Sequence, residues 1–255
     1  MGQRAALLIS TTASSSAALA ELALLLKAPD IGVFDAVEML EAPDAATLQE
    51  AIAAFFRLRK PADLLFLFFH GAAVATPDGD LQLVTGDATN VPLAVLTSAM
   101  NRSFSRRQIV IIDARADATR MVDALEGDGK WRQVLCRGTA DPLLPRLAAG
   151  LADGSADVDR DGWIDLREVH EYLCAAPGAG GAPVLARYGS RERFFFAGNG
   201  RQAAARDPIK WDILTGMVLT PLIIAGIGGL ADGQIATVFA LFFLLLYGML
   251  YRLAD

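Results

Sequence analysis

The sequence predicts an α/β domain with a mostly parallel sheet flanked by helices, followed by a two-helix transmembrane hairpin. Three observations lead to this fold class. Apolar runs of strand length alternate with segments whose apolar residues recur at helical spacing. Some of these runs are continuous, which is typical of parallel strands covered on both faces. Near the C-terminus, two further apolar runs contain no charged residue.

The composition limits the class of protein. The chain has 255 residues, 53% of them hydrophobic and 20% charged, with a net charge of -6 and a mean hydropathy of +0.37. These values exclude an intrinsically disordered, collagen-like or basic nucleic-acid-binding chain. The acidic surplus, without a basic stripe, argues for no nucleic acid partner. Cys136 and Cys174 form no CxxC pair and fit a reducing compartment.

The first half of the domain reads as two strand and helix pairs. Residues 5–10 (AALLIS) form an apolar run of strand length, too short for the core of a secretory signal peptide, so the domain is expected to stay in the cytoplasm. Residues 14–26 are rich in Ala and Leu behind a serine that can cap a helix. Residues 33–40 alternate partially, as a strand does. Residues 45–58 carry apolar side chains at helical spacing.

The second half continues the alternation. Residues 64–69 (LLFLFF) form a continuous apolar run, as expected of a strand buried on both faces. Residues 81–84 predict a short strand and residues 93–102 a helix. Residues 108–113 (QIVIID) predict another buried strand. Functional side chains in such sheets gather at the carboxyl ends of the strands.

Two strand ends carry motifs. The first continues into Phe-Phe-His-Gly at residues 68–71, and the second into Ile-Asp-Ala-Arg-Ala-Asp at residues 112–117. This pair resembles the caspase and metacaspase superfamily of cysteine peptidases, in which one strand ends in Ser-Gly-His-Gly and a later one in Asp-[Ala/Cys]-Cys-[His/Tyr]-Ser-Gly. Looser matches in the same order extend the resemblance over residues 4–199, which implies a caspase-like domain at residues 1–200.

The departures from the family pattern concern its catalytic residues. The resemblance places the nucleophile at Arg115, and a permanently protonated guanidinium cannot attack a carbonyl. His70 matches the catalytic histidine, but Phe68 and Phe69 replace the Ser-Gly that helps to form the oxyanion site. Asp113 matches a residue that receives basic substrate side chains in some members. We therefore expect His70 and Asp113 to be remnants and the peptidase activity to be lost. In the simpler interpretation, His70 is a strand-end residue with an ordinary hydrogen bond.

Two further hypotheses concern the region around position 115. Because Arg115 lies two residues from both Asp113 and Asp117, it could pair with either carboxylate and fill the substrate pocket from within. A replacement nucleophile would have to be Cys136, in a strand-like segment, or Cys174, in a late helix. Each is predicted to be a small buried apolar residue instead.

Residues 157–168 match the twelve-residue calcium loop of an EF-hand. Gly162 occupies the sharp turn. The predicted ligands are the carboxylates at loop positions 1, 3, 5, 9 and 12 and the backbone carbonyl at position 7, which are Asp157, Asp159, Asp161, Asp165, Glu168 and Trp163. Ca²⁺ is therefore the cofactor that the pattern predicts. In the alternative interpretation, the stretch is a turn whose Asp residues cap the following helix.

The two uncharged runs predict the hairpin. A linker at residues 201–212 leads into a first transmembrane helix at residues 213–231, and a short turn leads into a second at residues 235–253. Both runs are apolar all round, which fits a lipid bilayer better than a buried helix pair. Basic residues flank the hairpin and only Asp232 lies in its turn. Both termini are therefore expected in the cytoplasm, with the protein in the inner membrane.

Together these features predict a membrane-anchored, catalytically inactive caspase-like protein. It would act as a recognition or scaffold module, or as a membrane effector, in a bacterial signalling or defence system. The expected partners are the bilayer and either further copies of the chain or a caspase-like or sensor protein. Two alternatives stay open: an active membrane-tethered cysteine peptidase, and a regulatory anchor that binds a true caspase-like peptidase through its sheet edge.

Overall fold

The computed structural model describes residues 2–12, 15–125, 132–138, 143–175, 183–188 and 193–199. The predicted linker and transmembrane hairpin lie outside these residues. Among the helices that are described, none combines the length and apolar character needed to cross a bilayer.

The elements alternate along the chain much as the sequence predicts. The described strands are β1 (Arg4–Ser10), β2 (Ala36–Glu41), β3 (Leu64–Ala75), β4 (Leu81–Val84), β5 (Asn90–Pro92), β6 (Arg107–Arg115), β7 (Arg132–Arg137), β8 (Trp163–Asp165), β9 (Val184–Tyr188) and β10 (Phe195–Gly198). The described helices are α1 (Ser16–Lys27), α2 (Ala45–Phe56), α3 (Leu93–Arg102), α4 (Ala118–Ala124), α5 (Leu143–Asp153) and α6 (Leu166–Ala175).

The main sheet is mostly parallel, as predicted. Its strands follow the order β2-β1-β3-β6-β7-β9, and only the edge strand β9 runs antiparallel to its neighbour along this path. Strands β4 and β5 continue from the long β3 as an antiparallel extension. Strands β8 and β10 form a separate antiparallel pair. The predicted α/β class with a mostly parallel sheet is confirmed.

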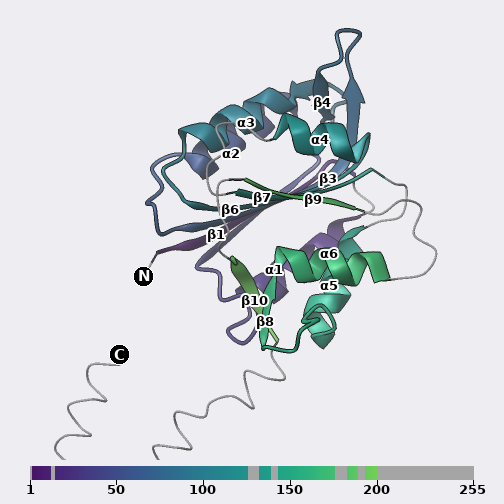
Figure 1. Ribbon diagram of the computed structural model, residues 1–255. Coiled ribbons are helices and arrows are strands. Elements are labelled where there is room, and N and C mark those ends of the chain that lie inside the picture. The colour runs from purple at the N-terminus through teal and green to yellow at the C-terminus, as the bar shows by residue number, and fades with distance from the viewer. Residues whose placement is uncertain are drawn as a thin grey trace, which may run out of the picture. The chain divides into compact units, whose positions relative to one another are not determined.

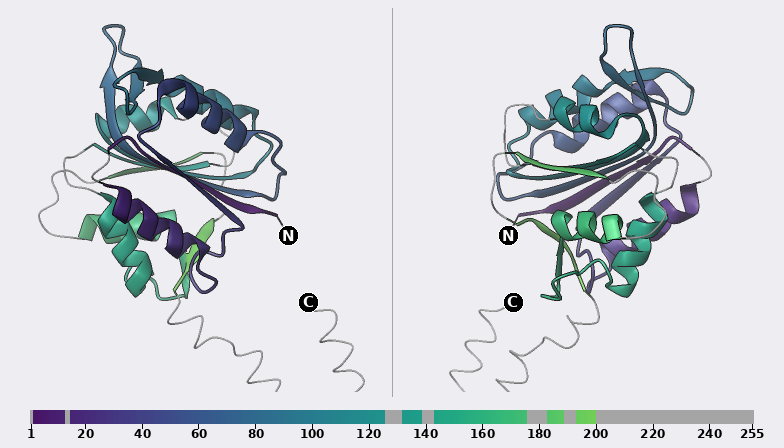
Figure 2. Two further views of the ribbon diagram at one scale, coloured as in Figure 1. Left: turned by 180° about the vertical axis from the view of Figure 1, so that it is seen from behind. Right: turned by 45° about the vertical axis from the view of Figure 1, so that its right-hand side comes forward.

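Helices cover both faces of this sheet (Figures 1 and 2). One core lies under α2, α3 and α4, and the other lies against α1, α5 and α6. Strand β3 serves both, because Leu65, Leu67 and Phe69 point into the first core while Phe66 and Phe68 point into the second. Each such side chain contributes about 1.5–3 kcal/mol when fully buried. The continuous apolar run of β3 thus follows from its central position.

Several predicted boundaries were wrong. Strand β3 does not end at Phe69 but continues to Ala75, because its last residues pair with β4. Strand β2 begins at Ala36 rather than at Val33, whose backbone has a φ of 53° and cannot belong to a strand. Helix α2 ends at Phe56, shortly before Leu58 adopts a φ of 57°.

The small β8–β10 pair is attached to the α1 and α5 side of the domain. The ring of Phe196 in β10 stacks on Phe66 of the main sheet, with ring centroids 5.2 Å apart. Arg4 donates a hydrogen bond from Nη2 to the Phe196 carbonyl at 2.8 Å. The Gly198 amide donates to the Ile31 carbonyl at 2.6 Å. These contacts hold β10 against the domain near the point where the chain continues into its C-terminal segment.

Candidate functional site

Four polar side chains form a row across the carboxyl ends of the parallel strands. The register pairs Ser10 of β1 with His70 of β3, His70 with Asp113 of β6, and Asp113 with Arg137 of β7. Side chains alternate along a strand, so all four project on the face covered by α1 and α5. We call these residues the polar row. Three of them are buried, with Ser10 1%, Asp113 3% and Arg137 0% exposed.

The centre of the polar row is a His–Asp pair. Nδ1 of His70 lies 2.9 Å from Oδ2 of Asp113, and the same oxygen accepts the backbone N–H of Leu143 at 3.0 Å. Leu143 is the first residue of α5, so the carboxylate joins the sheet to the start of that helix. The pair orients the imidazole. Of the His70 side chain, 16% remains exposed.

Position 115 lies one register pair beyond this row. Arg115 is the last residue of β6, pairs in register with Ala72 and projects on the same face as Asp113. Its side chain is exposed. Within the described part of the chain, neither Asp113 nor Asp117 pairs with Arg115, since Asp113 bonds His70 and Asp117 caps α4. The hypothesis that Arg115 fills the pocket by pairing with either carboxylate was therefore wrong.

The two cysteines differ. Cys136 is fully buried in the core under α2 to α4, as predicted, and this burial raises the pKa of its thiol. Cys174 is exposed, so the prediction that it is buried was wrong. Its Sγ lies 3.6 Å from Nε2 of His170, one helical turn earlier on α6. That Nε2 also contacts the Pro183 carbonyl at 3.0 Å.

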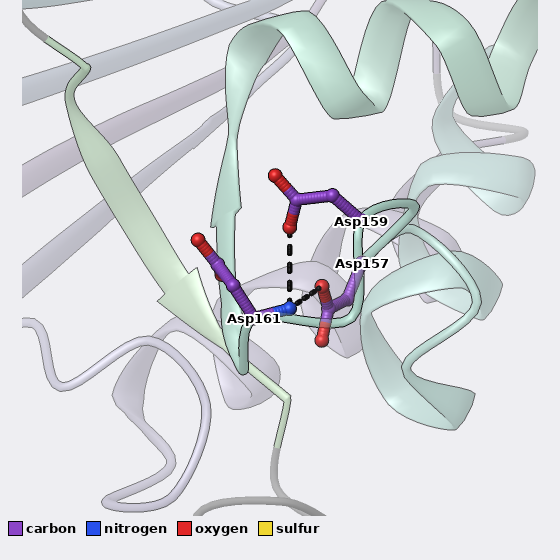
Figure 3. A group of neighbouring side chains, drawn as sticks. All are labelled: Asp157, Asp159 and Asp161. Carbon is purple, nitrogen blue, oxygen red and sulfur yellow. Dashed lines mark hydrogen bonds between the residues drawn. The ribbon is translucent and has the colours of Figure 1, made fainter.

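Residues 157–168, which we call the acidic loop, follow α5 and include strand β8 and the first turn of α6. Carboxylate oxygens of Asp157, Asp159 and Asp161 lie within 4.8 Å of one another (Figure 3). The Asp161 amide donates to Asp157 and Asp159 at 3.1 and 3.2 Å. The Gly162 amide donates to Asp157 at 3.0 Å, from a residue whose φ of 90° favours glycine. The first half of the loop therefore folds around its own carboxylates.

The second half of the acidic loop begins helix α6. The Glu168 amide donates to Asp165 Oδ1 and the Asp165 amide donates to Glu168 Oε2, both at 3.0 Å, which is a reciprocal N-cap. Both carboxylates are buried. Burial raises the pKa of the Glu168 carboxyl, with further contributions from neighbouring carboxylates. Trp163, whose carbonyl was predicted to be a ligand, has a side chain that is 55% exposed.

A guanidinium lies among these carboxylates. Arg193, two residues before β10, bonds four of the five, with donor–acceptor distances of 2.7 Å to Asp165, 3.0 Å to Asp159, and 3.3 Å to both Asp161 and Glu168. The hydrogen bond with Asp165 is the largest cause that raises the pKa of Arg193. The donor set is of the type that Ca²⁺ prefers. With Arg193 in place the arrangement does not fit the ion, because this side chain already bonds four of the six predicted ligands.

Sequence reasoning identified His70, Asp113 and the acidic loop but missed Ser10, Arg137 and Arg193. The first two follow apolar strands directly, and that position could have drawn attention to them. Arg193 could not have been found this way, because its link to the acidic loop depends on the pairing of β10 with β8.

No protein-family model and no curated protein sequence matches this chain. Its fold is nevertheless similar to solved structures. The Drosophila initiator caspase Dronc matches with a TM-score of 0.52 and 8% identity, over 75% of this chain and 82% of Dronc. Protein GSU0716 from Geobacter sulfurreducens matches with a TM-score of 0.50 and 13% identity, over 77% of this chain and 93% of the other. At such low identities the likeness shows the fold alone, and that fold is caspase-like.

Proposed function

We propose that this protein is a membrane-anchored, catalytically inactive caspase-like protein. In this proposal it serves a bacterial signalling or defence system as a recognition or scaffold module, or as a membrane effector. One observation carries the proposal: an exposed Arg115 stands where the family pattern has its nucleophile.

The geometry around Arg115 supports the loss of peptidase chemistry. A thiolate at position 115 would project on the same sheet face as His70, because Arg115 and Asp113 are two residues apart on β6 and Asp113 pairs with His70. The place for a nucleophile beside a histidine is therefore kept, while the side chain there is a permanent cation that cannot attack a carbonyl. Burial of Cys136 leaves no thiol in its strand accessible to a substrate.

The test uses peptide probes that alkylate catalytic thiols. The full chain, its Cys174→Ser variant and an Arg115→Cys variant in the Cys174→Ser background are incubated with the probes. We expect no labelling of Cys174→Ser and restored labelling at position 115 in the double variant. Cleavage of basic or acidic peptides by the native chain would overturn the proposal. The matched variant Cys136→Ser controls for labelling in the core.

A second candidate function is supported by the Cys174–His170 pair. An exposed thiol lies 3.6 Å from Nε2 of an imidazole, which brings a cysteine and a histidine together. In this arrangement Nε2 donates its proton to the Pro183 carbonyl, so it would have to leave that carbonyl before it could act as the base. We keep it second because the pair lies on helix α6 rather than in the polar row. Peptide cleavage that is lost in both Cys174→Ser and His170→Gln would favour this active peptidase over the inactive protein.

We also propose Ca²⁺ as an ion that the acidic loop can accept when Arg193 leaves it. The support is the spacing of the carboxylates and the closeness of Asp157, Asp159 and Asp161. Isothermal titration of the full chain and of Arg193→Gln measures the binding. If neither the native chain nor Arg193→Gln shows a heat of binding at millimolar Ca²⁺, the proposal that the acidic loop accepts Ca²⁺ is wrong.

A further inference from the structure

We infer that Arg193 is the built-in cation of the acidic loop, and that their ion pairs form a latch that fastens strand β10 to the domain. The inference concerns a device for holding the last described strand and goes beyond the proposed function.

The contacts come from one side chain that crosses between distant parts of the chain. Nε of Arg193 donates to Asp165, Nη1 to Asp161, and Nη2 to both Asp159 and Glu168. Every nitrogen of the guanidinium is thus directed at the acidic loop. A planar fork with several donors suits this task, whereas a lysine ammonium would reach fewer of the oxygens.

Two of the carboxylates that Arg193 bonds are buried, and this burial makes the ion pairs important for stability. Asp165 is 1% and Glu168 0% exposed. Ion pairs between exposed groups contribute little to stability, but a buried carboxylate that loses its counter-charge is costly. The Arg193 side chain is only partly buried at 34% exposure, so it closes the acidic loop from the solvent side. We therefore expect the loop and β10 to depend on this charge.

Packing fixes Arg193 in place independently of the carboxylates. Its guanidinium lies over the ring of Phe195, 5.0 Å from the centroid, and that ring packs against Trp163 at 6.2 Å between centroids. These aromatic residues belong to the paired strands β10 and β8. A cation held between an aromatic ring and a group of carboxylates is a fixed part of the folded structure and not a transient surface contact.

The other end of β10 is tied to the same loop. Asn199 donates from Nδ2 to Asp157 at 3.2 Å and from its backbone amide to the Gly162 carbonyl at 3.0 Å. Arg193 and Asn199 therefore flank β10 and between them bond all five carboxylates of the acidic loop. Residue 200 follows immediately, so the latch fixes the point where the chain continues toward its apolar C-terminal segment.

Amide hydrogen exchange on the full chain in detergent tests the latch. We expect Arg193→Gln to speed exchange in β8 and β10 by about tenfold or more, because local opening no longer has to break the ion pairs. The matched control is Arg167→Gln. Arg167 also bonds Asp159 and is 35% exposed, but it belongs to α6 and does not reach β10. Its removal should leave exchange in β10 within about twofold of the native value.

Added Ca²⁺ shows whether Arg193 holds β10 through its charge or through its packing against Phe195. In Arg193→Gln, millimolar Ca²⁺ should slow exchange in β10 again, while in the native chain it should change little. Equal exchange in Arg193→Gln and Arg167→Gln would overturn the latch. If titration shows that Ca²⁺ binds Arg193→Gln but exchange in β10 stays fast, Arg193 acts by packing and not as a cation. If Arg193→Gln does not fold, Arg193→Lys is measured instead, with a smaller increase expected in the same strands.

Discussion

At the scale of single residues, Asp113 is the residue that connects the polar row to the rest of the domain. Its buried carboxylate accepts hydrogen bonds from His70 and from the Leu143 amide, and so joins β3, β6 and α5. We expect Asp113→Ala to lower the free energy of unfolding by about 1–3 kcal/mol, because two donors lose their acceptor. Urea denaturation measures the change. Asp123→Ala, in the exposed part of α4, is the control and should stay within about 0.5 kcal/mol. Equal effects of the two variants would mean that these bonds do not form in solution.

The two thiols give a second prediction at this scale. A thiol-specific reagent should modify only one cysteine in the native chain, because Cys174 is exposed, whereas burial raises the pKa of Cys136 and keeps reagents away. Denaturation should release the second thiol. The Cys174→Ser variant should therefore show almost no reactive thiol before denaturation, and fast reaction of this variant would contradict the buried position of Cys136.

The residues of the candidate site show which features could be predicted from the sequence. His70 and Asp113 each stand after an apolar run, so their positions were predictable, but their pairing depends on the register between β3 and β6. Arg115 illustrates the limit. Its spacing suggested a pair with Asp113, yet the neighbouring strand supplies His70 as the partner of that carboxylate. Local spacing is a weak guide where a sheet brings distant residues together.

At the scale of elements, helix α4 follows directly from the strand that carries Asp113 and Arg115. Asp117 caps it by accepting the amides of Thr119 and Arg120 at 2.9 and 3.2 Å. We expect Asp117→Ala to lower the free energy of unfolding by about 1 kcal/mol and Asp117→Asn to change it little, because Asn is an equally good cap. Thermal and urea unfolding of both variants check this. If Asn destabilised as much as Ala, the charge rather than the cap would be responsible.

Helix α2 has a cap whose effect should depend on pH. Asp44 accepts the Thr47 amide at 2.7 Å, and this backbone hydrogen bond is the largest cause that lowers the pKa of Asp44 from its ordinary value of 3.8. Because the pKa of Asp44 is lower in the folded than in the unfolded chain, its carboxylate stabilises the fold fully at any pH above its pKa in the unfolded chain. This stabilisation is lost as the pH falls through its pKa in the folded chain. The native chain should therefore lose its advantage in melting temperature over Asp44→Ala below about pH 4. A constant difference down to pH 2 would contradict this.

The elements also show where pattern reasoning fails. Apolar periodicity found the central strands because burial on both faces dictates their composition. It placed the end of β3 too early, since residues 70 and 71 still pair with β6 and residues 72–75 are held by backbone pairing with β4, so this part of the strand needs no apolar run. The pair of β8 and β10 is short, and Arg193 and Asn199, which flank β10, bond the carboxylates of the acidic loop. Such polar contacts between distant residues have no periodic pattern in the sequence.

At the scale of the whole molecule, the chain divides into compact units at Met1–Ala203 and Ala204–Asp255. The first contains the caspase-like fold and has ordinary cores on both faces of its sheet. The surplus of hydrophobicity in the composition belongs to the second, where the predicted spans 213–231 and 235–253 lie. Transmembrane helices are readily predicted from the sequence, because a helix that spans a bilayer mainly requires a long apolar run.

The predicted hairpin can be tested by fractionation. We expect the full chain to remain with membranes in alkaline carbonate and a chain truncated before Trp211 to be released. Leu222→Lys and Leu244→Lys each place a charge in mid-span, at a cost of about 2.5–3.5 kcal/mol each. Together they should release most of the protein. Leu24→Lys is the matched control, since Leu24 is 70% exposed on α1 and a charge there faces water. Retention of the doubly charged variant, or release of the native chain, would show that residues 213–253 do not hold the protein in the bilayer.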